Sequence, residues 1–355
     1  MSAFTYGVAV RPRHLPQRVL LFARNDADGQ VYVNGDQGLG WEGWRLLSAS
    51  GVPSAIPGVA NQPVSSLTAQ TYDDAHLLFA TGMYDARSYF TSSSDGATWA
   101  AWAEVPPGGT TDAALAAVQG FDGRLLLFAK GGNDSQSWVN IASWTTPPAM
   151  TWTGWKQLPA LARSLAAPIA VTRYPDVLLY LAGPTWLGAM YLRYTWDGHQ
   201  WSGPDYPDRF LMGAVVAKNW QDSIYFFFTS NGQPTWMSTN DGLALSPWHA
   251  VAGLTTDGPL SVLAADRLYL FANGRDGVLN VNVADPGAGD LVWEGWQPVP
   301  GSFTTGIAVA ATSVAVPMRW TVAETLASTL GVTTGGALLG VRGVDGENNV
   351  PSYHD

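Results

Sequence analysis

The chain has 355 residues, of which 46% are apolar, 13% are charged and 17 are tryptophan, enough for a large and unusually aromatic core. A net charge of −10 argues against partners that present phosphates, so we expect no nucleic-acid binding. Cysteine is absent, which excludes disulfides and thiolate metal sites.

The start of the chain carries no recognisable targeting signal. It lacks the charged and apolar regions of a signal peptide. No apolar run reaches the roughly 20 residues that a membrane-spanning helix needs. We therefore expect a protein without membrane insertion that is cytoplasmic, or that is released without a recognisable signal peptide.

Four short strands are predicted in the first stretch of the chain, at residues 6–12, 18–24, 30–34 and 41–47. The second reads VLLFA at 19–23, and the fourth begins with WEGW at 41–44. Asp-Gly pairs such as Asp28-Gly29 separate the strands, and both residues tolerate the positive φ of a tight hairpin.

This sequence pattern of strands and turns repeats along the chain. The apolar strand returns as HLLFA at 76–80, RLLLFAK at 124–130 and RLYLFAN at 267–273, and the tryptophan motif returns as WAAW, WTGW and WEGW. Repeats of roughly 45–58 residues are typical of propeller blades. Runs such as 224–228 are continuously apolar, as expected of sheets that are buried on both faces.

The repeats predict an all-β protein, a single seven-bladed β-propeller of four-stranded antiparallel blades that spans residues 1–355. The predicted blades cover residues 5–52, 63–108, 111–160, 164–207, 211–253, 257–301 and 304–355. Six blades followed by a tail are the alternative count.

The seventh repeat is the least regular. Its predicted strands are 306–312, 314–320, 336–344 and 349–353, and residues 323–336 contain an insertion that could form a short helix. The chain then begins and ends at a blade boundary. We therefore expect the ring to close through side-chain packing, with little or no exchange of strands.

The two tryptophans of each WxxW motif are predicted to have different roles. Residues i and i+3 of a regular strand point to opposite faces. One tryptophan would fill the interface between blades, and the other could line a groove, where a sugar ring stacks on the indole. Packing of both tryptophans in the wedge between blades is the alternative.

The turn after the second strand is polar in three repeats, which hold Arg24 and Asp26, Asp134, and Arg275 and Asp276. Such side chains beside a tryptophan could bind vicinal hydroxyls, or they could form ordinary solvated turns. The five histidines show no metal-ligand spacing, and no phosphate loop or catalytic pair is visible, so we predict no cofactor, no metal and no catalytic residues.

The stretch Ser92–Trp99, SSSDGATW, is similar to the Asp box of sialidase-type propellers, with one residue of difference in spacing. In that family the box braces the turn between the third and fourth strands. The family's Arg-Ile-Pro signature is missing, and its nearest counterpart is Val10-Arg11-Pro12. The resemblance thus supports the fold and not the reaction.

Together, the LxLFA strands and WxGW strands resemble the seven-bladed bacterial lectins of the Photorhabdus PLL type, which bind fucose and related sugars between blades. The resemblance is good in repeats one to three and six. It implies that the motif tryptophans bind ligand: Trp41, Trp44, Trp99, Trp102, Trp152, Trp155, Trp293 and Trp296, with Trp248 in the looser copy LSPW at 245–248.

The leading hypothesis is therefore a carbohydrate-binding protein with shallow tryptophan-lined sites and with glycans, fucose or related sugars, as partners. The alternatives are an enzyme with one site at the mouth of the central channel, glycosidase-like or of another kind, and a protein-interaction scaffold. The sequence leaves a homo-oligomer open.

Overall fold

The structure is a computed structural model that describes residues 17–36, 40–47, 64–73, 75–146, 149–158, 164, 166–185, 188–196, 200–205, 214–221, 223–229, 234–240, 246–256, 260–286, 291–301 and 310–315. All of them belong to one compact unit, Met1–Val316, and a second unit, Pro317–Asp355, lies outside the described residues. The described residues form twenty-six β-strands and no helix. They accordingly include no helix that could cross a membrane.

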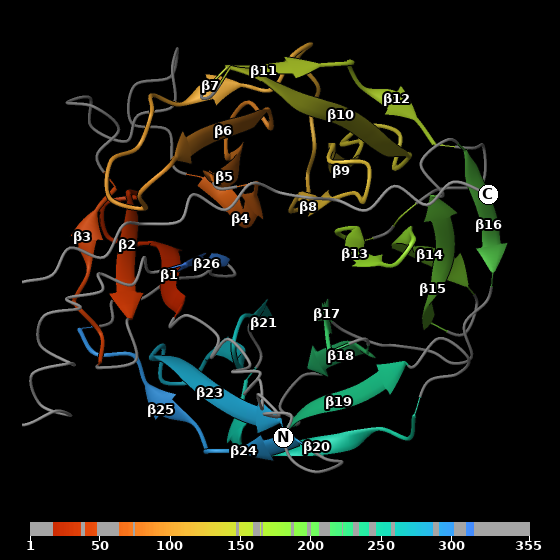
Figure 1. The fold of residues 1–355 in the computed structure, drawn as a ribbon. Coiled ribbons are helices and arrows are strands. Elements are labelled where there is room, and N and C mark those ends of the chain that lie inside the picture. Colours follow the sequence, from red (N-terminus) through yellow and green to blue (C-terminus); the bar gives the residue numbers. More distant parts are fainter. Residues whose placement is uncertain are drawn as a thin grey trace, which may run out of the picture. The chain divides into compact units, whose positions relative to one another are not determined.

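Six antiparallel sheets are arranged in a ring, and we call them blades 1 to 6 (Figure 1). From the centre outward, blade 1 consists of β26 (Ala310–Ala315), β1 (Gln17–Arg24), β2 (Val31–Asp36) and β3 (Arg45–Leu46). Blade 2 consists of β4 (Val64–Tyr72), β5 (Ala75–Gly82), β6 (Ser88–Ser93) and β7 (Ala103–Glu104). Blade 3 consists of β8 (Ala116–Gln119), β9 (Leu125–Lys130), β10 (Ser137–Thr146), and β11 (Ala149–Trp152) with β12 (Lys156–Gln157).

The other three blades repeat this order. Blade 4 consists of β13 (Ile169–Arg173), β14 (Asp176–Thr185), β15 (Gly188–Trp196) and β16 (Trp201–Asp205). Blade 5 consists of β17 (Ala214–Trp220), β18 (Ser223–Thr229), β19 (Pro234–Asn240) and β20 (His249–Thr255). Blade 6 consists of β21 (Leu260–Ala264), β22 (Leu268–Asn273), β23 (Leu279–Pro286), and β24 (Leu291–Trp293) with β25 (Gln297–Pro298).

The ring closes through an exchanged strand. β26 pairs with β1 in antiparallel register, with Leu21 opposite Ala311, so the innermost strand of blade 1 comes from the far end of the described chain. The inner strands of the six blades contact one another in a closed cycle, β4, β8, β13, β17, β21, β26 and back to β4. The described residues thus confirm the alternative count of six blades.

The predicted closure by packing alone is wrong, because residues 310–312 do not start a seventh blade. They pair with β1 and complete the sheet whose other strands come from the start of the chain. Of the remaining predictions, the strand at 6–12, the insertion at 323–336 and the strands at 336–344 and 349–353 lie outside the described residues.

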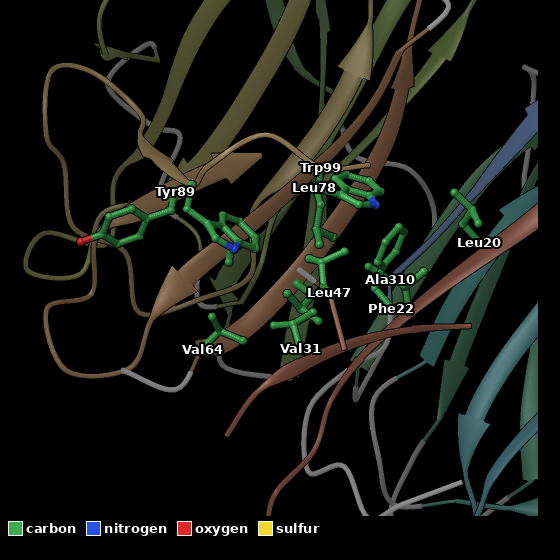
Figure 2. Close-up of a cluster of buried hydrophobic side chains, with 13 residues drawn as sticks. Leu20, Phe22, Val31, Leu47, Val64, Leu78, Tyr89, Trp99 and Ala310 are labelled. Carbon is green, nitrogen blue, oxygen red and sulfur yellow. The ribbon is translucent and has the colours of Figure 1, made fainter. Parts of the chain in front are cut away.

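The apolar core is divided among the six blade interfaces. Each of the six clusters of buried side chains joins residues of two neighbouring blades. Between blades 1 and 2, Phe22 and Leu47 of blade 1 meet Leu78 and Trp99 of blade 2 (Figure 2). Both faces of every sheet are therefore buried, which explains the continuously apolar strands.

The first tryptophan of the motif packs edge-on against an aromatic ring of the preceding blade. Trp99 contacts Phe22 with ring centroids 5.2 Å apart, and Trp201, which begins the weaker copy WSGP at 201–204, contacts Phe128 at 5.7 Å. The same contact joins Trp293 to Phe227 at 6.0 Å. The phenylalanine of one repeat and the tryptophan of the next thus form one recurring joint of the ring.

The prediction that the two tryptophans of a motif face opposite ways is wrong. Both members of each pair Trp41/Trp44 and Trp152/Trp155 pack into the cluster shared with the preceding blade. A bulge is the reason: Trp152 lies opposite Ala142 but Lys156 lies opposite Val139, so the outer strand holds one extra residue. Residues i and i+3 then share a face.

In three blades a glycine adopts the backbone conformation that this bulge requires. Gly43, Gly154 and Gly295 precede the second tryptophan and have φ of 100°, 86° and 97°, a region that side chains with a Cβ rarely adopt. In blades 1 and 6 a buried asparagine of the third strand accepts a hydrogen bond from this glycine, Asn34 from Gly43 at 2.9 Å and Asn282 from Gly295 at 3.0 Å.

The Asp box has the bracing role that its resemblance implied. Asp95 Oδ1 accepts hydrogen bonds from the amides of Thr98 at 2.7 Å and Ala97 at 2.8 Å, and the Ser93 hydroxyl donates to the same oxygen at 2.9 Å. These donors, the Thr98 amide foremost, lower the pKa of Asp95 to about 2. The ionised carboxylate therefore holds the turn between β6 and the tryptophan strand.

We expect Asp95→Ala to lower the free energy of unfolding at pH 7 by about 1 kcal/mol, as for the loss of a helix-capping carboxylate. Because the folded-state pKa lies below the ordinary value of 3.8, this stabilisation is present above about pH 4 and is lost as the pH falls towards 2. Urea unfolding at pH 7 and pH 2.5 measures both. Asp95→Asn, which retains an acceptor, should lose less of the free energy of unfolding at pH 7. If Asp95→Ala lowered the free energy of unfolding equally at both pH values, the bracing role of the ionised Asp95 carboxylate would be contradicted.

Candidate functional site

A pocket of about 360 Å³ lies between blades 2 and 3. Its walls are Ser88 of blade 2, the linking segment 107–110, the turn 131–134 after β9, and the side chains of Trp138 and Trp155. The pocket therefore contains two of the residues singled out in the sequence, Asp134 and Trp155.

The linking segment is held firmly between the two blades by backbone and side-chain bonds. The Thr111 amide donates to Ala86 O of blade 2 at 2.7 Å, and the Gly132 amide of blade 3 donates to Thr110 O at 3.1 Å. The buried Lys130 ammonium also donates to the carboxylate of Asp112 at 2.7 Å. One wall of the pocket is thus preformed rather than a free loop.

Trp155 lies against a glycine of this wall. A Cβ built on Gly109 would come within 3.2 Å of both Cδ1 and Nε1 of the Trp155 ring. The indole nitrogen is buried there and has no hydrogen-bond partner among the described residues. The glycine lets the backbone approach the ring edge closely, and the half-buried ring lines the pocket.

The side chains of Asp134 and Trp138 both lie close to another glycine, Gly131. A Cβ on Gly131 would come within 2.1 Å of Asp134 Oδ1 and 3.0 Å of Trp138 Nε1, so a carboxylate acceptor and an indole donor lie side by side. Asp134 Oδ1 already accepts from the Gln136 amide at 2.9 Å. The second carboxylate oxygen of the exposed Asp134 is the one available to a ligand.

A wider recess of about 660 Å³ shares residues 108–110 with the pocket and adds an ion pair of blade 2. Arg87 Nη1 donates to Glu104 Oε2 at 3.0 Å and to Oε1 at 3.2 Å. Arg87 is 52% exposed and Glu104 33% exposed, so both charged groups face solvent beside the pocket. Neither residue was singled out in the sequence.

The turn aspartates have a structural role that the sequence reading did not identify. In four blades the turn after the second strand holds an aspartate that accepts a hydrogen bond from the amide two residues later, at 2.9 to 3.0 Å. These are Asp28, Asp85, Asp134 and Asp276. Asp26 is therefore not the counterpart of Asp134 in blade 1, and Asp85 is the counterpart in blade 2.

Two of these aspartates also bind a tyrosine of the third strand. Tyr89 donates to Asp85 at 2.5 Å and Tyr32 donates to Asp28 at 2.8 Å. Burial, followed by the bond to Asp85, raises the pKa of Tyr89 well above its usual range, so the phenol stays neutral. Trp138 takes the position of these tyrosines in blade 3, where the indole replaces the phenol.

The other predicted residues lie elsewhere around the ring. Trp99 and Trp102 are only 1% and 4% exposed, which favours a packing role. Trp248 packs edge-on against Phe228 at 4.8 Å. Half-buried rings that pack against the preceding blade are those of Trp41, Trp44, Trp152, Trp293 and Trp296.

The remaining charged candidates are not gathered in one place. Arg24 forms an ion pair with Asp26 and donates to Val64 O of blade 2 at 2.7 Å, which ties the two blades together. Arg275 and Asp276 are exposed in the corresponding turn of blade 6.

The central channel has a mainly apolar lining. A cavity of about 180 Å³ is lined by the inner strands of all six blades, mainly by alanine, valine and leucine, and Lys218 is the charged residue in that lining. Among the described residues no group of three or more histidine, aspartate or glutamate side chains could hold a metal ion.

No family model and no curated protein matches the sequence. Several solved structures match the fold. The Aleuria aurantia lectin, as a variant in complex with Fucα1-6GlcNAc, is 12% identical with a TM-score of 0.55, over 86% of this chain and 94% of that chain. Another structure of the same lectin, described as a six-bladed β-propeller with a novel fucose recognition mode, gives the same identity and TM-score over 86% and 93%.

A Hadza microbial sialidase, Hz136, is 10% identical with a TM-score of 0.50, over 85% of this chain and 66% of that chain. At such low identity these similarities show architecture and not activity. The chain shares the β-propeller fold with fungal lectins and with sialidases.

Proposed function

We propose that this protein is a carbohydrate-binding propeller whose site is the pocket between blades 2 and 3. The observation that carries the proposal is the convergence of Trp138, Trp155 and Asp134 on one hollow with a preformed wall, next to the recess that holds the Arg87–Glu104 pair. A volume of about 360 Å³ accommodates one sugar residue.

The chemistry of these groups matches that of a sugar. A pyranose has an apolar face of C–H groups that can stack on an indole ring, and hydroxyls that both donate and accept. The Trp138 N–H and Arg87 supply donors, while Asp134 and Glu104 supply acceptors. Vicinal hydroxyls suit a carboxylate beside a guanidinium, since both partners of the ion pair remain partly exposed.

The shared fold supports the same class of ligand. The Aleuria lectins with which the chain shares its architecture are described as fucose-specific and as complexes with fucosides. We therefore propose fucose or a related sugar, presented at the end of a glycan, as the first ligand to test. Binding, rather than hydrolysis, is the function that we propose.

The sites are not repeated around the ring, and we propose one strong site in each chain. The counterparts of Glu104 opposite the third strand are Leu46 in blade 1, Gln157 in blade 3 and Pro298 in blade 6. The contact between a tryptophan and a glycine recurs, with Trp296 on Gly253 and Trp44 on Gly301, but without this ion pair beside it.

We expect Trp155→Ala to weaken binding of methyl α-L-fucoside by about tenfold or more, because the loss of a stacking surface removes at least 1.4 kcal/mol. Asp134→Asn and Glu104→Gln, which preserve shape, should weaken it severalfold. Isothermal titration calorimetry gives affinity and stoichiometry, and a panel of other methyl glycosides tests the choice of sugar.

Trp296→Ala is the matched control, because this ring has the same contact with a glycine at another interface. It should leave the affinity unchanged. If a glycan array and titration with millimolar monosaccharides reveal no ligand, or if both tryptophan variants lose binding equally, carbohydrate recognition at this pocket is overturned.

A further inference from the structure

A second cavity, of about 340 Å³, lies at one end of the central channel. Its lining includes Gln70, Gln119, Thr172 and Lys218, which lie near the carboxyl ends of the inner strands of blades 2, 3, 4 and 5. The inner strands of successive blades run in the same direction around the ring, so these polar ends meet at one mouth of the channel.

Lys218 is the charged residue among the described linings of both this cavity and the channel below it. No described carboxylate forms an ion pair with its ammonium group. Burial lowers its pKa from the usual value, and no negative charge among the described residues offsets that effect. A partly buried cation without a counter-ion is costly, and a bound anion would relieve that cost.

The wall of the cavity adds one polar group whose hydrogen-bonding capacity is not fully used. The side-chain oxygen of Asn219, the next residue after Lys218, is buried and has no hydrogen-bond partner among the described residues. Since oxygen and nitrogen of an amide can exchange places, Asn219 can present a donor to a ligand oxygen. An uncharged donor beside a cation suits a small anion.

The rim of the cavity is aromatic. Phe121 lines the cavity and is 52% exposed, and its ring packs edge-on against Tyr174, which is 81% exposed, with centroids 5.2 Å apart. Both lie in turns between the inner and second strands, of blades 3 and 4. Two large exposed rings beside a polar cavity indicate a ligand with an apolar part.

We propose that this mouth of the channel binds a small organic carboxylate that carries an aromatic or aliphatic group. The carboxylate lies next to Lys218 and Asn219, and the apolar group packs against Phe121. The cavity holds one ring of that size. This site is separate from the pocket between blades 2 and 3, and it shares none of that pocket's residues.

Benzoate is the probe that tests the proposal. Ligand-observed NMR titration should show binding to the full chain, weaker binding of acetate, and no binding of benzyl alcohol. Lys218→Met should weaken benzoate binding by about tenfold or more, since the ion pair is lost. Phe121→Ser should weaken the binding of benzoate but leave the binding of acetate unchanged.

Lys156→Met is the control, because Lys156 is an exposed lysine on β12, outside the cavity. It should bind benzoate as the unmodified protein does. Lys218→Met should also melt at a higher temperature than the unmodified protein, which shows that it folds. Equal benzoate binding by the two methionine variants, no binding by the unmodified protein, or displacement of benzoate by inorganic phosphate with the same affinity would each overturn the proposal.

Discussion

A disulfide between positions 17 and 315 is expected to form on mild oxidation of the double variant Gln17→Cys/Ala315→Cys. The two residues are partners in the register of β1 and β26, and the natural chain has no cysteine to compete. A link that closes a loop of about 300 residues stabilises by up to about 5–6 kcal/mol in the chain-entropy model, and engineered disulfides reach part of this.

Chemical denaturation with and without reductant measures the effect. The free energy of unfolding of the oxidised double variant should exceed that of the reduced form by at least about 2 kcal/mol. The control pairs Gln17→Cys with Ala27→Cys, which lies in the turn beyond the other end of β1 and should not form a link. Failure of the 17–315 pair to oxidise in the folded protein would mean that β26 does not close blade 1.

Trp99→Ala should lower the free energy of unfolding by about 3–5 kcal/mol, the usual cost of removing a large buried aromatic side chain. Trp99 is 1% exposed and packs on Phe22, so its loss opens a void between blades 1 and 2 (Figure 2). Trp99→Phe retains part of the contact and should lose less.

Urea unfolding followed by circular dichroism measures this prediction. Tyr84→Ala is the control, because Tyr84 is 75% exposed and its removal should change stability by no more than about 0.5 kcal/mol. If Trp99→Ala were as mild as Tyr84→Ala, the aromatic joint between blades would not be the source of the ring's stability.

The sequence predicted the strands well where burial dictates composition. The predicted strands at 76–80, 124–130 and 267–273 correspond to β5, β9 and β22 to within one residue at the start of β9 and β22, because a strand that is buried on both faces must be apolar throughout. The Asp-box turn was also predictable, since its side chains bond to their own neighbours along the chain.

The closure of the ring was not predictable from local pattern. β26 reads AATSVA, which suits the inner strand of any blade, and only the pairing with β1 decides to which blade it belongs. Pairing between residues so far apart in the sequence leaves no spacing or composition that marks it. The orientation of the tryptophan pairs failed for a local reason, because the glycine of WxGW introduces a bulge that shifts the strand by one residue.

Only part of the candidate site could be predicted from the sequence. Trp155 and Asp134 belong to repeated motifs, and the sequence could indicate them, although not that they share one pocket. Arg87 and Glu104 occur in one blade only, so no repeat marks them. A search for the positions at which one repeat differs from the others, rather than for what all repeats share, would have found this pair.

Blade 1 is built from two distant parts of the chain, and this has a consequence for the protein's synthesis. On the ribosome β1 is made long before the strand that covers its inner edge, which is complete only when residue 315 is made. At about 5–20 residues per second, the open edge waits for roughly 15–60 s. During that interval the nascent protein presents an apolar, unpaired strand edge, at which other chains can pair.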